Sequence, residues 1–154
     1  MNSMKIFIGS DHAGFELKEK VKNSLIEQGY QIEDKGAFEL NDNDDYPDFI
    51  VPVARAISEN ENSFGIILGG SGQGEQIVAN KIDGVRAIEY YGDNLDIVKL
   101  GREHNNANIL SLGARFVNEK EAIGAIKIFL NTSFSGEKRH ERRIEEISSI
   151  EENN

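Results

Sequence analysis

The sequence contains no cysteine, and this absence removes several kinds of chemistry at once. Disulfide bonds, metal sites built on thiolates and catalysis by a cysteine nucleophile are all excluded. Apolar runs are short as well, and none approaches the roughly 20 residues that a membrane-spanning helix requires. Residues 1–6 lead directly into an apolar strand pattern and lack the architecture of a signal peptide. We therefore expect a cytoplasmic protein that is not inserted in a membrane.

Positive charge is also scarce. The chain carries 17 lysine and arginine residues against 27 aspartate and glutamate residues, which gives a net charge of −10. Binding to nucleic acid or to an anionic membrane surface is therefore not expected. An anionic small molecule requires a local concentration of cations, and the segment RHERR at residues 139–143 supplies one.

Short apolar segments alternate along the 154 residues with segments of helical periodicity. We expect strands at 5–9, 30–34, 64–68, 85–90 and 108–112, and helices at 15–28, 47–58, 75–81, 93–103, 118–131 and 137–150. This alternation predicts an α/β protein with a three-layer, Rossmann-like fold, in which helices cover both faces of a five-stranded parallel sheet. Residues 1–150 are expected to form one domain, and residues 151–154 an acidic tail.

The most informative segment is the loop GGSGQGE at residues 69–75, between an apolar strand pattern and a helical pattern. Four glycines in six positions let the backbone approach a ligand closely, and the amides of a helix start attract anions. Glu75 adds a proton acceptor beside these amides, which suits chemistry in which a bound oxygen becomes negative. A tight turn with Glu75 facing the helix dipole is the structural alternative. The loop matches neither the dinucleotide motif nor the P-loop.

Other candidate residues follow from the expected topology. Ligands of parallel α/β folds bind where the strands end, so Asp11 and His12 after the first strand and Arg115 after the fifth should lie at the same edge as the glycine loop. Arg139 and Arg143 are four residues apart on the last helix, so both guanidinium groups can reach one phosphate. A solvated helix with Arg–Glu pairs is the alternative.

Three separated blocks resemble ribose-5-phosphate isomerase type B and the related galactose-6-phosphate isomerases. They are GSDHAGF at 9–15, GGSGQGEQ with its Ala-Asn-Lys ending at 69–81, and HNNAN at 104–108 with Gly113 and Arg115 beyond it. The residues Tyr46-Pro47-Asp48 and the segment 139–143 complete a resemblance that spans almost the whole chain in order. It implies interconversion of ribose 5-phosphate and ribulose 5-phosphate without metal or cofactor. It also implies a homodimer, or a tetramer, with active sites shared between subunits and the last helix at the dimer interface.

The resemblance also implies a role for each matching residue. Many members carry a cysteine at the start of the loop as the base, whereas position 69 is glycine here and Glu75 matches a second subgroup that uses glutamate. Glu75 would then move a proton from C2 to C1. The remaining roles would be ring opening by Asp11 and His104, oxyanion stabilisation by Gly70, Ser71, Gly72, Gly74 and Asn105, phosphate binding by His12, Arg115, Arg139 and Arg143, and lining of the sugar pocket by Tyr46.

Three alternatives stay open at this stage. An isomerase of the same fold could act on a hexose 6-phosphate such as that of galactose or allose, because spacing does not reveal pocket depth. A non-catalytic phosphosugar-binding module would keep the phosphate site, and a flavodoxin-like protein would bind a nucleotide. The pKa of Glu75 is also open, since burial raises it and the helix dipole lowers it.

Overall fold

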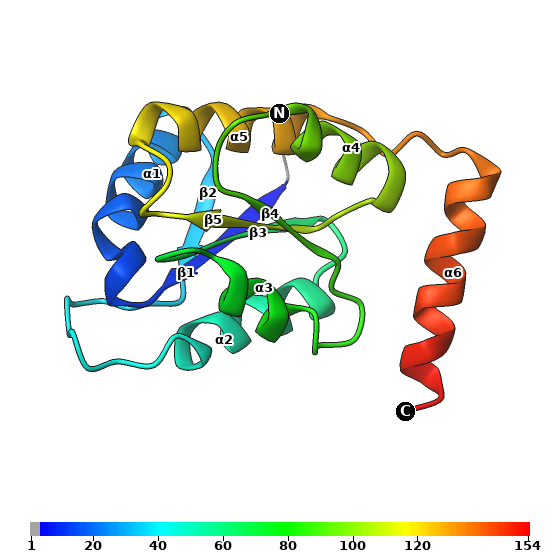
Figure 1. The fold of residues 1–154 in the computed structure, drawn as a ribbon, viewed down its shortest axis with the longest axis horizontal. Coiled ribbons are helices and arrows are strands. Elements are labelled where there is room, and N and C mark those ends of the chain that lie inside the picture. Colours follow the sequence, from blue (N-terminus) through cyan, green and yellow to red (C-terminus); the bar gives the residue numbers. More distant parts are fainter. Residues whose placement is uncertain (1–3) are drawn as a thin grey trace.

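The computed structural model describes residues 4–154, so the first three residues of the expected domain lie outside it. Five parallel strands form one sheet in the spatial order β2–β1–β3–β5–β4 (Figure 1). The strands are β1 (Lys5–Ser10), β2 (Gln31–Asp34), β3 (Ser63–Gly69), β4 (Ala87–Tyr90) and β5 (Ile109–Gly113). The expected α/β fold with a five-stranded parallel sheet is confirmed.

Helices cover both faces of this sheet, as Figure 1 shows. One layer contains α1 (Phe15–Glu27), α4 (Asp96–Asn105) and α5 (Glu119–Asn131), and the other contains α2 (Pro47–Glu59) and α3 (Gln73–Ala79). A short 3-10 helix, η1 (His12–Gly14), precedes α1, and α6 (Lys138–Glu152) ends the chain. The central strands read as continuous apolar runs because successive residues alternate between two buried faces. Ile6 and Ile8 pack in the α1–α4–α5 layer, whereas Phe7 packs against α2.

The order of the strands creates a topological switch point between β1 and β3. These strands are neighbours, but the chain leaves β1 towards β2 on one side and leaves β3 towards β5 and β4 on the other. Connections therefore diverge at the ends of β1 and β3, where α/β folds bind their ligands. The segments that follow are η1 with His12 and the glycine loop with Glu75.

Two helix boundaries differ from the sequence prediction in an informative way. Helix α3 begins at Gln73, two residues earlier than expected, because Gly72 takes the left-handed conformation (φ 82°) at its N-cap. Helix α6 runs on to Glu152, two residues into the expected acidic tail. The Glu151 carboxylate accepts hydrogen bonds from the Gly84 amide at 3.0 and 3.1 Å.

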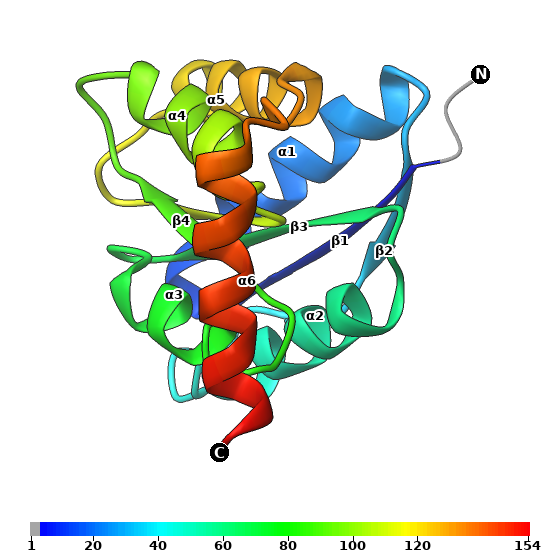
Figure 2. The ribbon, with the colours of Figure 1, turned by 90° about the vertical axis from the view of Figure 1, so that its right-hand side faces the viewer.

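Helix α6 stands beside the sheet rather than in either helix layer (Figure 2). Its buried His140 stacks on the ring of His104 at the end of α4, with 4.3 Å between ring centroids. Near the C-terminal end of the helix, Glu151 is hydrogen-bonded to Gly84 in the turn before β4. Ile147 and Ile150 remain 43% and 63% exposed. The helix therefore spans the thickness of the molecule at the edge where the strands begin, and keeps apolar side chains in contact with solvent.

Candidate active site

Glu75 is the buried carboxylate of the glycine loop. It lies in the first turn of α3 and is 4% exposed. Its side chain folds back over the end of β3, and a Cβ atom at Gly69 would collide with the Glu75 carboxylate. Glycine at position 69 is therefore required by the position of Glu75. A cysteine at that position, as expected of the other subgroup, would occupy the same space.

The pKa of Glu75 is raised above the ordinary value for glutamate. Burial is the largest cause, and the negative charge of Asp11 adds to it, while a backbone hydrogen bond acts in the opposite direction. Burial thus outweighs the hydrogen bond from the Glu75 backbone amide. A carboxylate with a raised pKa is a better general base near neutral pH than an ordinary one.

The glycine loop is fixed from the β5 side as well. The amides of Ala114 and Arg115 donate hydrogen bonds to the carbonyl oxygens of Gly69 and Gly70, at 2.8 and 3.0 Å. The Arg115 guanidinium lies against Gly70, where an added Cβ would be 2.9 Å from its terminal nitrogen. The Ser71 Oγ accepts a hydrogen bond from the Gln73 amide at 3.3 Å, which leaves the hydroxyl hydrogen free to donate to a ligand.

Asp11 holds the turn after β1. Its Oδ1 accepts hydrogen bonds from the amides of Ala13 and Gly14, at 3.0 and 3.4 Å, so it is the N-cap of η1. This capping role is compatible with a catalytic one. The carboxylate is 6% exposed and acts electrostatically on Glu75.

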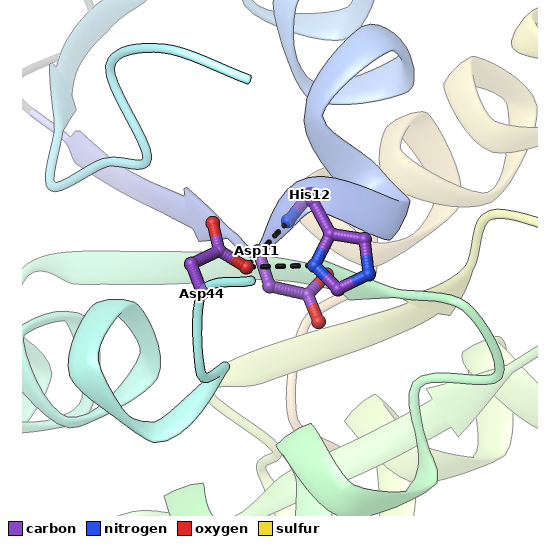
Figure 3. Close-up of side chains that lie close together, drawn as sticks. All are labelled: Asp11, His12 and Asp44. Atoms are coloured by element: carbon purple, nitrogen blue, oxygen red, sulfur yellow. Dashed lines mark hydrogen bonds and ion pairs between the residues drawn. The ribbon is translucent and has the colours of Figure 1, made fainter. Parts of the chain in front are cut away.

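His12 is oriented by Asp44, a residue that the sequence analysis did not single out (Figure 3). The Asp44 Oδ1 lies 2.7 Å from His12 Nδ1 and accepts from the His12 amide at 3.1 Å. The second ring nitrogen points away from Asp44 (Figure 3). The hydrogen bond with Asp44 is the largest cause of a raised His12 pKa, which favours the cationic imidazolium. An oriented cation of this kind suits phosphate binding.

Asp11, His12 and Asp44 form the one group of possible metal ligands within residues 4–154. One ligand atom from each of Asp11, His12 and Asp44 lies within 4.8 Å of the others. The Asp11 carboxylate caps η1 and the Asp44 carboxylate bonds the imidazole, so these donors are already engaged with the protein. This engagement fits a hydrogen-bonded histidine better than a metal centre.

Tyr46 reaches the glycine loop from the start of α2. An added Cβ at Gly74 would lie 2.6 Å from the Tyr46 hydroxyl oxygen, so the phenol contacts the backbone of the first turn of α3. The residues gathered where the strands end are named here the carboxyl-edge group: Asp11, His12, Tyr46, Gly70, Ser71, Gly72, Gly74, Glu75 and Arg115. Their grouping at one edge of the sheet was predicted from the topology, apart from Tyr46.

Four other candidate residues lie at the opposite edge. Helix α4 connects the end of β4 to the start of β5, so its last residues, His104 and Asn105, lie where the strands begin. The Asn105 carbonyl oxygen accepts a hydrogen bond of 2.8 Å from Arg86, directly before β4. Arg139 and Arg143 belong to α6, whose His140 stacks on His104 at this edge. We call His104, Asn105, Arg139 and Arg143 the amino-edge group. A single chain does not bring the two groups together.

The arginines of the amino-edge group are accessible. The Arg139 side chain is 56% exposed, and one of its guanidinium nitrogens lies 3.4 Å from the Glu137 carboxylate. Within the part of the chain that the structure describes, Arg143 makes no ion pair with a carboxylate at 4.0 Å or less. Both guanidinium groups can therefore bind an anion presented from outside the chain.

A buried carboxylate against a glycine-rich loop, with an oriented imidazole at the same edge of the sheet, is an arrangement that suits an enzyme that moves a proton next to a carbonyl group. The chain belongs to the Ribose/Galactose Isomerase family, whose model matches residues 6–147. This membership removes the nucleotide-binding alternative. None of the helices within residues 4–154 has the length and hydrophobicity of a membrane span.

Relatives match the chain over nearly its full length. It is 41% identical to ribose-5-phosphate isomerase B of Mycolicibacterium paratuberculosis over 148 residues, which cover 96% of this chain and 92% of that protein. The Escherichia coli enzyme of the same name is 36% identical, covering 96% and 97% of the two chains. The structure of ribose-5-phosphate isomerase B from Mycoplasma genitalium with bound ribulose-5-phosphate superposes with a TM-score of 0.94, at 37% identity and with full coverage of both chains.

Proposed function

We propose that this protein interconverts ribose 5-phosphate and ribulose 5-phosphate through an enediolate, with Glu75 as the base. The observation that carries the proposal is the burial of the Glu75 carboxylate against Gly69, beside a loop of backbone amides. The ribulose-5-phosphate bound to the Mycoplasma genitalium relative supports the choice of a pentose phosphate. A cytoplasmic location belongs to the same proposal, because phosphorylated sugars are handled where they are made.

The carboxyl-edge group supplies the proton transfer. Glu75 takes the proton from C2 of the open-chain sugar and returns it to C1. Amides of the loop from Gly70 to Gly74, together with the Ser71 hydroxyl, stabilise the negative oxygen that develops between the two steps. Each such donor can contribute about 3 kcal/mol to lowering the barrier. Tyr46 lines the sugar site, since its hydroxyl already lies against the loop.

Ring opening and phosphate binding require residues of both groups. Asp11 and His104 act as the acid–base pair that opens the sugar ring, and Asn105 donates to the enediolate. The phosphate is held by His12, Arg115, Arg139 and Arg143. A dianion held by several cations orients a small sugar, and its binding energy serves the reaction at the other end of the molecule.

These roles require two copies of the chain, because the amino-edge group lies at the far edge of the sheet from Glu75. In the proposed homodimer, the amino-edge group of one chain completes the carboxyl-edge group of the other. The exposed isoleucines of α6, Ile147 and Ile150, make this helix a suitable part of the interface. Pairs of such dimers would give the tetramer that the family resemblance also allows.

The function is tested by proton exchange at C2 of ribose 5-phosphate in deuterated water, with chelator-treated protein. We expect exchange and isomerisation in the wild type, and we expect both to fall by about 10²- to 10⁴-fold in Glu75→Gln. A panel with galactose 6-phosphate and allose 6-phosphate separates the alternative substrates, since the preferred sugar has the highest kcat/KM. Binding of ribose 5-phosphate without exchange would instead indicate the non-catalytic module.

The shared site is tested by subunit mixing. Glu75→Gln and His104→Ala homodimers should each be inactive, whereas a hybrid dimer has one intact site and one doubly altered site. Random reassociation makes about half of the dimers hybrids, so about a quarter of wild-type activity should return. If a mixture shown to contain hybrid dimers recovered no activity, the carboxyl-edge and amino-edge groups would not form an active site across two chains.

A further inference from the structure

Glu89 is a buried acidic side chain that the roles above do not use. It lies on β4 beside Ser111 of β5, with which it is in register. Both carboxyl oxygens of Glu89 are buried, and neither has a hydrogen-bond partner among the residues that the structure describes. Burying a carboxyl group without a partner is costly, and far more so when it is ionised. A side chain in this position therefore calls for a functional explanation.

Glu89 lies directly beneath the glycine loop. An added Cβ at Gly72 would be 2.6 Å from Glu89 Oε2 and 2.9 Å from Ser111 Oγ. The Ser111 hydroxyl also donates a hydrogen bond of 2.6 Å to the Gly72 carbonyl oxygen. Two neighbouring side chains of the sheet thus support the residue that caps α3. Glu75 is three residues further on, in the first turn of that helix.

We propose that Glu89 is a positioning residue for the isomerisation: its uncharged carboxyl group, with Ser111, supports Gly72 from below and so fixes the loop amides and the Glu75 carboxylate. The inference rests on the proposed function for its catalytic consequence. Glu89 itself does not touch the substrate. Its contribution is to fill the space beneath Gly72 without adding a second negative charge beside the enediolate.

The electrostatics agree with an uncharged Glu89 at neutral pH. Burial is the largest cause that raises the pKa of Glu89, to about 8, and the negative charge of Glu75 is the second. Two carboxyl groups that interact in this way do not both ionise readily, so one remains protonated. Because the pKa of Glu89 is raised to about 8, Glu89 is the carboxyl group that keeps its proton near pH 7, and Glu75 serves as the proposed base.

Other titratable groups face Glu89 from the elements around it. A cavity of about 540 Å³ lies along the free edge of β4, and Glu89 forms part of its wall. Its titratable lining residues besides Glu89 are Tyr90, Tyr91, Asp93 and, from α4, His104. Helix α3 contributes Glu75 on its loop side, and β5 contributes only the hydroxyl of Ser111. Of these groups, Glu75 is the one whose charge raises the pKa of Glu89.

The experiment compares Glu89→Gln and Glu89→Ala across pH 6 to 10. The glutamine variant keeps the shape and stays neutral, so its kcat near pH 7 should match the wild type. Wild-type kcat should decline as pH rises through about 8, because ionised Glu89 repels the enediolate, and Glu89→Gln should lack this decline. Glu89→Ala should lose about 10- to 100-fold in kcat with little change in KM, since a shift of about 1 Å can cost 100-fold.

Two kinetic outcomes would overturn the proposal: an alkaline decline that persists unchanged in Glu89→Gln, or full kcat in Glu89→Ala. Both leave the proposed function intact, because they require an active wild-type enzyme that depends on Glu75.

A second measurement does not depend on activity. Because the native state keeps the Glu89 proton to higher pH than the unfolded chain does, thermal stability should fall as pH rises from about 4.5 to about 8. Glu89→Gln should lose this part of the fall, while the exposed Glu61→Gln should retain it. Identical pH dependence of Tm in Glu89→Gln and wild type would reject an uncharged, buried Glu89 even if no isomerase activity were found.

Discussion

The carboxyl-edge and amino-edge groups are built in opposite ways. The two carboxylates of the carboxyl-edge group are internal, since Glu75 and Asp11 are 4% and 6% exposed, and the glycine loop is hydrogen-bonded to the end of β5. The amino-edge group is external, with Arg139 and Arg143 on an exposed helix surface. One chain thus carries buried carboxylates of the proposed proton-transfer site at one edge and long, exposed cationic side chains at the other. In the proposed function, proton transfer needs fixed distances and uses the buried residues, whereas binding of the phosphate uses the exposed ones.

The largest expected effect comes from a substitution in the buried carboxyl-edge group. Glu75→Gln removes the base but keeps the volume, so kcat should fall by about 10²- to 10⁴-fold, the usual contribution of a general base, while ribose 5-phosphate still binds. The exposed Glu61→Gln is the control. Steady-state kinetics and ligand titration measure the two effects separately, and a wild-type kcat in Glu75→Gln would remove the carboxylate from the mechanism.

The next effect concerns the space that Glu75 occupies. Gly69→Ala places a methyl group where the Glu75 carboxylate lies, so the base must move, and kcat should fall by about 100-fold. Gly124→Ala is a matched control, because an added Cβ on this α5 residue meets nothing within 4 Å. If both variants kept wild-type kcat, the close packing of Glu75 on residue 69 would have no catalytic importance.

A smaller effect is expected from a substitution in the exposed amino-edge group. Arg143→Ala removes a charged hydrogen bond to the phosphate, worth roughly 1.5–3 kcal/mol, so kcat/KM for ribose 5-phosphate should fall by roughly 10- to 100-fold. Activity on unphosphorylated ribose, assayed at high enzyme concentration, should not change. Arg55→Ala, on the exposed side of α2, serves as control. Equal losses with both sugars would argue against phosphate binding by Arg143.

The smallest effect sharpens the role of His12. Its raised pKa depends first on the hydrogen bond that the imidazole makes to the Asp44 carboxylate, so Asp44→Asn should lower the pKa of His12. KM for the phosphorylated substrate should rise as pH increases through this pKa, and the rise should begin at lower pH in Asp44→Asn than in wild type. Histidine NMR titration measures the pKa directly. Asp42→Asn removes an equal charge without the hydrogen bond and should shift it less.

The raised pKa of His12 also makes the stability of the native state depend on pH. Since the native pKa of His12 is raised, its contribution to stability is present at low pH and disappears as pH rises through that value. Buried Glu89 also loses native stability towards alkaline pH, although there the cause is the cost of ionising a buried acid.

The fold was predictable because its determinants are local. Central strands such as Ile66-Ile67-Leu68 are apolar on both faces, and the helix expected from residue 118 starts with a capping box between Asn118 and Glu121. The sharing of one sheet edge by Asp11, the glycine loop and Arg115 followed from parallel topology. These inferences need only the order of elements, which the sequence contains directly.

The rest depends on contacts between distant residues. Asp44 lies in a loop with several acids, and no local signal indicates which of them meets His12. Glu89 follows Ile88 on a short strand, where a charged residue usually indicates a solvent-facing position, yet its oxygens are buried. The raised pKa of Glu75 depends on burial that only the packed structure reveals.

The collision between a side chain at position 69 and the Glu75 carboxylate has an evolutionary consequence. One small volume holds either a thiol arising from residue 69 or a carboxylate arising from residue 75. A lineage that exchanged one base for the other would pass through an impaired intermediate unless both positions changed together. Catalytic identity in such proteins is therefore inherited as a pair of residues rather than as a single one.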